Sequence, residues 1–541
     1  MKPYYLNSKI AIAGLFLLRS SIDINKSISC ILIAINLIAL INVAYADTVD
    51  EFILARMQEK GIPGLQVAIV QHNKVIKVDS YGIANIQDSI KVNKNTVFNI
   101  ASMTKAFTCV AVMQLVEQGK LNLSDKISAH IENLPNSWRR VTVHQVLSHS
   151  SGLPDIMNKH FQLIDSEGEA QSWKTVQQSK MLFDPGTAFH YNQTNFLIAG
   201  QIIQNVSGKS YSNLIKEYQL SKIGMNRTEA AGFAHFEDVN TNQARDYRKN
   251  TEGRLTNVLT SFPSSIRAGA GMSSNANELA QWVVALENNA FFEKKSSLSM
   301  LFKEASLNNS AWAKNNPNMH PYALGWYVVN RPLNRKIVTA GGGQSALAIY
   351  PDDALSIVIL TNLAGAAPEN MLDELAEFYL DDFGLPKNIK LLKQTLEKEG
   401  YRDAIRIAKS IDASQETKFS PVELHHFAEL LVKHNRTEQA QSIYNMNNQL
   451  FSKVVVSKHV LDQYLGDYKL ADFSINVSRK ANALLITATD DATLPIFADS
   501  ENKFTLEQLG VSITFIRDEY GIVTSLTLSL NNQKLIGKKL D

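Results

Sequence analysis

The sequence predicts an α+β domain followed by a short helical segment and a small antiparallel β domain. Residues 47–385 place short β-rich runs at both ends of a region with helical periodicity, residues 386–456 read as two helix pairs, and residues 457–541 alternate apolar and polar side chains. A chain of 541 residues exceeds the roughly 250–300 residues at which a single core stops growing. We therefore expect separate domains at these boundaries.

Residues 1–46 are predicted to be a signal peptide. Four Lys and Arg residues precede an apolar run from Ile28 to Val43, which ends in Ala44-Tyr45-Ala46, a small-residue cleavage site. The run is close to the ~20 residues that a membrane span needs, so retention of residues 28–46 as an anchor is the alternative. We expect an exported protein, periplasmic or secreted, which meets a membrane only if this segment is not cleaved.

Charge and cysteine content exclude several classes of function. Residues 1–46 carry a net charge of +3, and subtracting this from the +2 of the whole chain leaves −1 for the remainder. That balance gives no basic field for a nucleic-acid partner. Cys109 is the single cysteine after residue 46, so we expect a buried thiol and no intramolecular disulfide. No HExxH, spaced Cys/His cluster or Walker loop occurs, and we expect no cofactor.

The elements of the first domain follow from local patterns. "GLQVAIVQHNKVIKVDSYG" contains two β-rich runs separated by His72-Asn73, which predicts a hairpin. Helical periodicity runs from Lys105 to Glu117 and stops at Gly119. "YALGWYVV" and "LAIYPDDALSIVILTN" predict strands near the other end. Strands this far apart in the sequence must pair around the intervening helices, which gives the α+β class.

The last 156 residues contain two different patterns. Helical stretches beginning at Asn388 and Val422 each break in the middle, and Ala404 aligns with Ala440 at an offset of 36 residues. This is close to the ~34-residue period of tetratricopeptide repeats, and two copies are too few to stand alone. After residue 456, "DFSINVS", "ALLITAT", "SITFIRD" and "SLTLSL" predict a small antiparallel sheet or barrel.

A serine and a lysine stand three residues apart where the first long helix begins. Ser102 and Lys105 would share one helix face. A hydroxyl is a poor nucleophile until a base removes its proton, and a desolvated lysine can be such a base. By itself, however, S-x-x-K is equally well explained as an N-cap serine beside a solvated lysine.

Further motifs surround this pair in a fixed order: "IPGLQVAIV", "VFNIASMTKAFT", "LVEQGKLNLSDKI", "VTVHQVLSHSSGLPD", "DPGTAFHYNQTNFLIAGQII", "RAGAGMSSNANELAQW" and "YALGWYVV". With them the region resembles the serine β-lactamase and penicillin-binding-protein superfamily, in particular its class C β-lactamase and D-alanyl-D-alanine carboxypeptidase branch. The resemblance covers some 300 residues. It implies an antiparallel sheet flanked by helices, an all-helical lobe and an acyl-enzyme mechanism. The C-terminal part resembles modules appended to some exported hydrolases of this group.

The resemblance assigns roles to the first two motifs. Ser102 is the expected nucleophile, Lys105 its proton partner, and Tyr191 a phenol or phenolate that relays a proton to the leaving group. The second motif usually reads Y-x-N, and this chain has Gln193 in the third place. The amide is kept, but it lies one methylene further from the backbone.

The third motif departs from the family more strongly. Thr339-Ala340-Gly341 stands where the family has a basic residue, a small residue and glycine. Gly341 and Gly342 are expected to let a substrate approach, and the Gly342 N–H to complete an oxyanion hole. The neutral Thr339 argues against efficient recognition of penicillin or D-Ala-D-Ala. Arg267 could supply the missing charge, although a surface position is the more ordinary expectation.

Two alternatives remain open. A Ser-His-Asp triad could form from Ser102, His149 and Asp155, but in the family that loop is structural. The Gln193 and Thr339 departures could instead mark an eroded, non-catalytic site that only binds peptidoglycan fragments or a partner. We expect a serine hydrolase acting on a small-molecule ester, amide or D-amino-acid peptide, with a cell-wall fragment as a possible ligand.

Overall fold

The computed structural model describes residues 48–540 except 160–161, 234–239, 259–262, 308–319, 331–335, 415–417, 472, 489–492 and 531–532. The predicted signal or anchor segment, residues 1–46, lies outside the described residues. Internal contacts divide the chain into residues 1–53 and residues 54–541, and in the first unit residues 48–53 are helical. Among the helices described, none combines the length and the apolar character that a membrane span requires.

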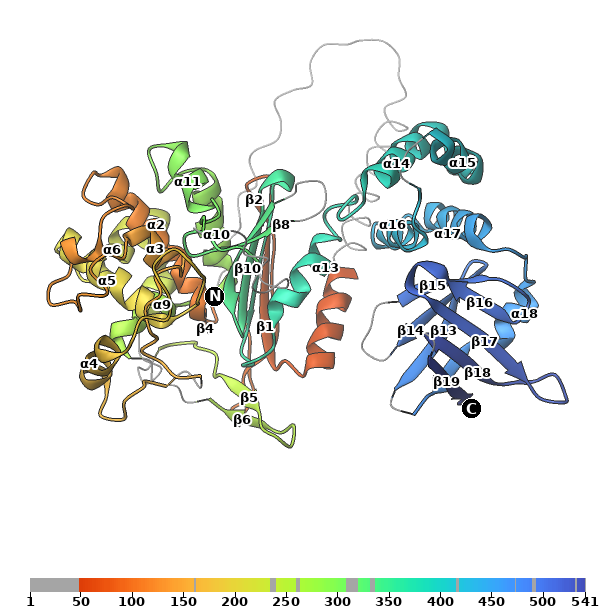
Figure 1. Ribbon diagram of the computed structural model, residues 1–541, viewed down its shortest axis with the longest axis horizontal. Helices are drawn as coiled ribbons and strands as arrows, with labels where there is room; N and C mark the ends of the chain where they lie inside the picture. The colour runs from red at the N-terminus through yellow and green to blue at the C-terminus, as the bar shows by residue number, and fades with distance from the viewer. Residues whose placement is uncertain are drawn as a thin grey trace, which may run out of the picture. The chain divides into compact units, whose positions relative to one another are not determined.

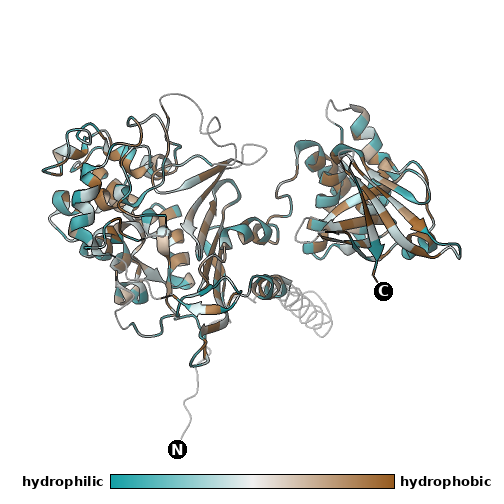
Figure 2. Ribbon diagram, turned by 60° about the horizontal axis from the view of Figure 1, so that its bottom comes forward, coloured by the Kyte–Doolittle hydropathy of each residue, from teal (hydrophilic) through white to brown (hydrophobic). Residues whose placement is uncertain are grey.

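A seven-stranded antiparallel sheet forms the centre of the first domain (Figure 1). The order is β3-β2-β1-β11-β10-β9-β8, and the hydropathy colouring shows apolar residues along these strands (Figure 2). The strands are β1 (Gly64–Gln71), β2 (Lys74–Asn85), β3 (Ile90–Lys91), β8 (Tyr327–Asn330), β9 (Lys336–Gly342), β10 (Ser345–Tyr350) and β11 (Leu355–Thr361). Every residue of β10 and β11 is buried, since helices cover both faces of the sheet.

The sheet confirms the predicted hairpin and strands. β1 and β2 are joined by His72 and Asn73, with φ of +48° and +59°. Positive φ at both residues is typical of the two-residue hairpin turn whose twist matches that of the flanking strands. β11 pairs with β1 in antiparallel register, with Ala68 opposite Val358. A strand from near the end of the domain, β11, therefore lies beside the first strand, β1, in the interior of the seven-stranded sheet.

The helical lobe lies on one side of this sheet and α13 on the other (Figure 1). The lobe's central helix α2 (Thr104–Glu117) confirms the helix predicted for this segment and is buried from Thr104 to Leu115. A helix that is buried on all sides can carry a lysine only if that lysine has internal partners. The other helices are α3 (Val143–Leu147), α4 (Glu169–Gln178), α5 (Gln193–Ser207), α6 (Tyr211–Ile215), α7 (Ser221–Ile223), α8 (Asn226–Ala231), α9 (Arg267–Ala270), α10 (Ala276–Glu287), α11 (Lys295–Leu301) and α13 (Leu372–Ala376).

Two short two-stranded sheets complete the domain. β4 (Phe98–Asn99) pairs with β7 (Ser273–Ser274), and β5 (Tyr247–Lys249) pairs with β6 (Leu255–Asn257). The β4–β7 pair matters for the site because β4 ends at Asn99, three residues before Ser102.

The predicted helix pairs are present after residue 385: α14 (Lys387–Glu399) with α15 (Ala404–Ser414), and α16 (Pro421–Lys433) with α17 (Thr437–Phe451). Ala404 and Ala440, which the repeat alignment matched, are 4% and 1% exposed and share one hydrophobic core. Assignment of this segment to the tetratricopeptide class remains a prediction.

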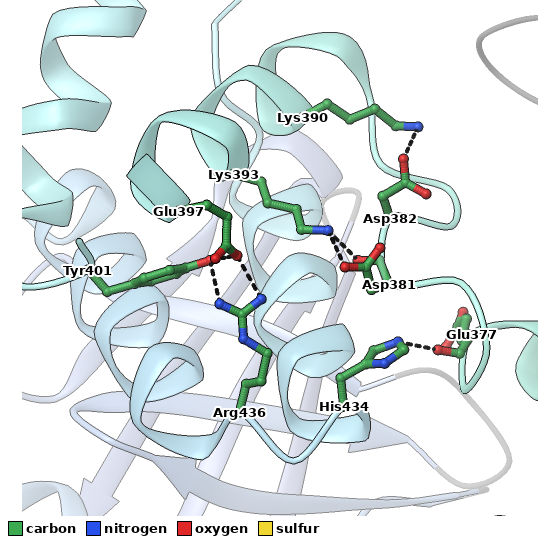
Figure 3. A network of polar contacts seen from close by, with 9 residues as sticks. All are labelled: Glu377, Asp381, Asp382, Lys390, Lys393, Glu397, Tyr401, His434 and Arg436. Carbon is green, nitrogen blue, oxygen red and sulfur yellow. Dashed lines mark hydrogen bonds and ion pairs between the residues drawn. The ribbon is translucent and has the colours of Figure 1, made fainter. Parts of the chain in front are cut away.

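A polar network connects the helices of this segment (Figure 3). Glu397 on α14 lies 2.6 Å from Arg436 and accepts a hydrogen bond of 2.8 Å from the Tyr401 hydroxyl. Lys393, on the same helix, lies 2.6 Å from Asp381. Each cation of these pairs therefore faces a carboxylate.

The C-terminal region forms a closed antiparallel barrel, which confirms the predicted β domain. Tyr464, Tyr468, Phe504 and Phe515 belong to the buried core of the barrel. The helix α18 (Lys458–Gln463) precedes its strands, which are β12 (Gly466–Lys469), β13 (Ser474–Lys480), β14 (Ala483–Ala488), β15 (Thr493–Ala498), β16 (Lys503–Leu506), β17 (Val511–Arg517), β18 (Val523–Leu530) and β19 (Gln533–Lys539).

Candidate active site

Ser102 lies in a short 3-10 turn, η1 (Ala101–Met103), directly before α2. Ala101 has φ of +44°, a conformation that costs an L-residue energy and needs local support. The support comes from Asn99, whose side-chain oxygen accepts a 2.9 Å hydrogen bond from the Ala101 N–H. Ser102 is half-buried, so the turn presents its hydroxyl at the start of the helix and leaves it partly open to solvent.

Lys105 points back toward Ser102 from the first turn of α2. The lysine is 1% exposed, and its ammonium nitrogen lies 3.2 Å from Ser102 Oγ, 3.1 Å from Gln193 Oε1 and 2.8 Å from the Gly269 carbonyl oxygen. Each of these three groups is neutral. No carboxylate is hydrogen-bonded to Lys105 within the described residues.

This set of partners also suits the neutral amine. Two of them, the Gln193 and Gly269 carbonyl oxygens, can only accept, while the Ser102 hydroxyl can also donate. A neutral amine has two hydrogens and one lone pair, so the lone pair can receive the Ser102 proton. Burial lowers the pKa of Lys105 from 10.5 to about 7, and the charge of the more distant Asp155 acts in the opposite direction.

Gly269 was not singled out from the sequence. A Cβ atom added at this position would lie 2.8 Å from Gln193 Oε1 and 3.5 Å from Lys105 Nζ. Glycine therefore lets α9 bring a carbonyl against the lysine. The position lies inside the quoted "RAGAGMSS" motif, but no sequence spacing marks a backbone acceptor.

Tyr191 lies beside both residues. The centre of its ring is 4.7 Å from Lys105 Nζ, and its hydroxyl lies close enough to the Ser102 side chain for the serine to influence its pKa. Burial raises the pKa of Tyr191 well above its usual value, and the neighbouring Ser102 opposes this only in part. Of the two forms expected from the sequence, these surroundings favour the phenol over the phenolate.

The start of α5 fixes the second motif. Asn192 is the N-cap, and its side chain accepts a 2.9 Å hydrogen bond from the Asn195 N–H. Gln193, which is 4% exposed, donates its backbone N–H to Asp155 Oδ1 at 3.0 Å. With the backbone held in this way, the longer Gln193 side chain reaches Lys105 directly.

The end of β9 flanks Ser102 on another side. Gly341 has φ of +151°, and a Cβ atom there would lie 2.2 Å from the Ser345 carbonyl oxygen, so the strand requires glycine. A Cβ atom at the exposed Gly342 would lie 3.5 Å from Ser102 Cβ. This proximity is what an oxyanion hole built from the Ser102 and Gly342 N–H groups requires.

Thr339 lies at the other end of the same motif. It is opposite Ala348 on one side and Tyr327 on the other, and the Tyr327 ring stacks on Tyr191 at 6.4 Å between centres. The register therefore brings Thr339 to the Tyr191 side of the site, where it contributes a neutral side chain.

The alternative triad does not assemble in the described residues. His149 is fully buried, and its Nδ1 accepts hydrogen bonds from the Asn192 N–H at 3.3 Å and from Asn195 Nδ2 at 3.0 Å. Burial lowers the pKa of His149 well below its usual value. Asp155 receives backbone N–H groups instead of the histidine. His149 therefore holds the start of α5 in place, as the structural interpretation of this loop expects.

Arg267 is not brought beside Thr339. It begins α9 and is half-buried in a pocket of about 380 Å³ that residues of α6 and α8 line. None of the predicted site residues lines that pocket.

Comparisons with known proteins agree with this geometry. The Beta-lactamase family model matches residues 49–380, and the chain belongs to this family, which places it among the serine hydrolases related to penicillin-binding proteins and esterases. Protein flp of Staphylococcus aureus (strain MW2) is 27% identical over 341 residues, which cover 60% of this chain and 65% of that protein. Penicillin-binding protein 4* of Bacillus subtilis (strain 168) is 24% identical over 81% of this chain and 87% of its own length.

Solved structures show the same fold. The octameric penicillin-binding protein homologue from Pyrococcus abyssi superimposes with a TM-score of 0.54 at 19% identity, over 91% of this chain and 99% of its own. EstCE1, described as a hydrolase with promiscuous acyltransferase activity, has a TM-score of 0.52 at 19% identity, over 61% of this chain and 96% of its own.

Proposed function

We propose that this protein is an exported serine hydrolase that forms an acyl-enzyme on Ser102, with Lys105 as the base and Tyr191 as the proton relay. The observation that carries the proposal is the placement of Lys105, which is buried, hydrogen-bonded among the described residues only to neutral groups, and within reach of the Ser102 hydroxyl. An ordinary solvated lysine beside an N-cap serine would be exposed and would have none of these partners.

The proposed reaction has two halves. Ser102 Oγ attacks the substrate carbonyl carbon as its proton moves to Lys105, and the Ser102 and Gly342 N–H groups hold the negative oxygen. Tyr191 passes a proton to the leaving alcohol or amine as the carbon–heteroatom bond breaks and is reprotonated from Lys105. Water then attacks the acyl-enzyme, its proton takes the same path in reverse, and the carboxylic acid leaves while Ser102 is restored.

The substrate we favour is an uncharged ester, an amide or a D-amino-acid peptide. Neutral Thr339 lies near Tyr191, so this position of the third motif offers no cation for a substrate carboxylate. The name of EstCE1 as a hydrolase and that of the B. subtilis relative as a penicillin-binding protein support an acyl-transfer site in this range.

Covalent labelling tests the proposal. Purified protein is treated with a fluorophosphonate probe, digested and analysed by mass spectrometry, with hydrolysis of p-nitrophenyl acetate measured in parallel. We expect an adduct on Ser102 and turnover, both of which are lost in Ser102→Ala. An equal adduct on Ser102→Ala would refute the assignment. Binding of peptidoglycan fragments without turnover by the wild type would favour the non-catalytic alternative.

Export is tested separately. We expect the protein recovered from the periplasm or the medium to begin at Asp47 when its N-terminus is sequenced. Recovery of the intact N-terminus from a membrane fraction would support the anchor instead.

A further inference from the structure

Asp246 is a half-buried carboxyl that the proposed reaction does not use. It precedes β5, and its Oδ1 accepts a 3.2 Å hydrogen bond from Gln344 Nε2. The Asn99 side chain lies close enough to the same carboxyl group to lower its pKa. Two side-chain amides from distant parts of the sequence therefore meet on one acid.

Each of these amides belongs to a segment that carries one N–H group of the expected oxyanion hole. Asn99 holds the Ala101 N–H at 2.9 Å and so supports the strained residue directly before Ser102. Gln344 donates its backbone N–H to the Gly342 carbonyl at 2.7 Å. The Ser102 and Gly342 N–H groups, which would bind the oxyanion, are three and two residues away in sequence from Asn99 and Gln344, the two amides beside Asp246.

The rest of the framework leaves Asp246 as the charged link. Gln344 is 8% exposed, and its backbone carbonyl accepts hydrogen bonds from the Thr361 N–H at 2.8 Å and the Thr361 hydroxyl at 3.0 Å. A second, uncharged link runs from the Ser345 hydroxyl to the Ile100 carbonyl at 2.7 Å. Among the described residues, Asp246 is therefore the one group of this framework that can change its charge. It lies between the segment that leads from Asn99 to Ser102 and the turn that contains Gly342 and Gln344.

We propose that Asp246 is a positioning residue that sets the spacing of the Ser102 and Gly342 N–H groups through Asn99 and Gln344. The inference rests on the proposed function, since it concerns the same oxyanion hole. An ionised carboxylate has two oxygens that accept from both amides, whereas the protonated acid turns one oxygen into a donor. Partners that orient metal ligands from the outer shell alter activity by roughly 10- to 100-fold, and we expect an effect of the same order here.

The charge of Asp246 depends on few neighbours. Burial raises the pKa of this carboxyl to about 7, and the hydrogen bond from Gln344 and the neighbouring Asn99 side chain oppose the rise. The adjacent Arg245 faces Asp88 at 3.9 Å. No charged side chain from β4, from the β9–β10 turn or from the segment before β5 is paired with Asp246 among the residues described here.

The first test separates transition-state binding from substrate binding. For Asp246→Asn we expect kcat on p-nitrophenyl acetate to fall by roughly 10- to 100-fold with KM within about threefold. The affinity for an arylboronic acid, which forms a tetrahedral adduct with a reactive serine, should fall by a similar factor. Asp88→Asn, which also removes a carboxylate on this side of the domain, should retain wild-type kcat.

The pH profile gives a second readout that a purely structural role would not change. Activity requires Lys105 to be neutral and should be roughly 10- to 100-fold higher when Asp246 is ionised, and the pKa of each lies at about 7. Over roughly the first one to two pH units below these pKa values, the acid limb of log kcat/KM should therefore be steeper than 1 in the wild type and have a slope of 1 in Asp246→Asn. Asp246→Asn is used because Asp246→Ala leaves two amides without an acceptor and could fail to fold.

The outcomes distinguish this inference from the proposed function. An active wild type that loses activity in Ser102→Ala, together with unchanged kcat, boronate affinity and slope in Asp246→Asn, would overturn only the role of Asp246. A parallel rise in KM and loss of thermal stability, without loss of kcat, would also contradict it. A wild type with no turnover would remove both proposals.

Discussion

Two polar clusters of this molecule treat their cations in opposite ways. At Ser102, Lys105 is 1% exposed and surrounded by a hydroxyl and two carbonyl oxygens. In the helical segment, Arg436 and Lys393 each face a carboxylate and remain partly exposed (Figure 3). In the first cluster, burial destabilises the charged form of the lysine. In the second, each cation is neutralised by a carboxylate.

The pKa directions follow from this difference. Burial lowers the pKa of Lys105 to about 7, whereas the hydrogen bond to Glu397 raises the pKa of Arg436. A lysine that is buried without a carboxylate partner can lose its proton near neutral pH, whereas a cation paired with a carboxylate keeps its proton. The comparison separates a site with the properties that the proposed proton transfer needs from a network of ion pairs between helices.

The largest expected effect is the loss of turnover in Lys105→Met. Methionine fills a similar volume but cannot accept the Ser102 proton, so kcat/KM should fall by about 10³-fold or more. Lys393→Met removes a lysine from the paired cluster and should retain wild-type turnover. Ester hydrolysis by both variants measures the difference, and equal losses in the two would break the comparison.

Lys105→Met also tests the comparison through the pH dependence of stability. The pKa of Lys105 is lower in the folded chain than in the unfolded chain, so between pH 7 and 10.5 the unfolded state binds more protons. The free energy of unfolding should therefore rise with pH for this group, by roughly 3 kcal/mol between pH 7 and 9.5. Urea unfolding of the wild type should show this increment relative to Lys105→Met, and parallel curves would contradict it.

Gln193→Glu would make the first cluster resemble the second. A carboxylate 3.1 Å from Lys105 Nζ, where the amide oxygen now lies, stabilises the ammonium and should raise its pKa by roughly 1–3 units. The acid limb of kcat/KM should shift upward by the same amount. Gln193→Met removes the acceptor without adding charge and should not produce that upward shift.

A smaller gain is expected from Thr339→Lys. A lysine opposite Tyr327 would extend toward Tyr191 and offer a cation to a substrate carboxylate. Acylation by carboxylate-bearing β-lactams should quicken by on the order of 10-fold, as a typical charge-assisted hydrogen bond contributes. Thr339→Met provides the uncharged control, and an unchanged acylation rate in Thr339→Lys would reject the role of the missing charge.

The smallest effect is expected from Glu397→Gln in the paired cluster. Glu397 and Arg436 have 43% and 26% exposed side chains, so the loss of their ion pair should lower the free energy of unfolding by about 1 kcal/mol or less. Ester hydrolysis should be unchanged. A loss of several kcal/mol would show that this network supports the fold more than its exposure indicates.

The strands and helices of the hydrolase domain follow directly from sequence patterns. His72-Asn73 marked the first hairpin, and the apolar run after Ser102 marked α2. The closed barrel could only be predicted as a sheet or barrel, because alternation records which face is buried and not how the last strand pairs with the first. That closing contact, between Tyr468 and Lys539, joins residues far apart in the chain.

The site was only partly accessible to sequence reasoning. Ser102, Lys105 and Tyr191 belong to motifs, and the structure places them together. Gly269 and Asp246 could not be found in the same way, because one acts through a backbone carbonyl and the other through two intervening amides. Such contributions depend on tertiary contacts that no local spacing records.

The most direct test of the central claim is an NMR titration of the Lys105 side chain, with Lys105→Met used to assign its resonance. The claim is that this lysine is neutral near physiological pH because it is buried among neutral partners. A titration midpoint near 7 is the predicted result. A midpoint near the ordinary lysine value of about 10.4 would contradict it.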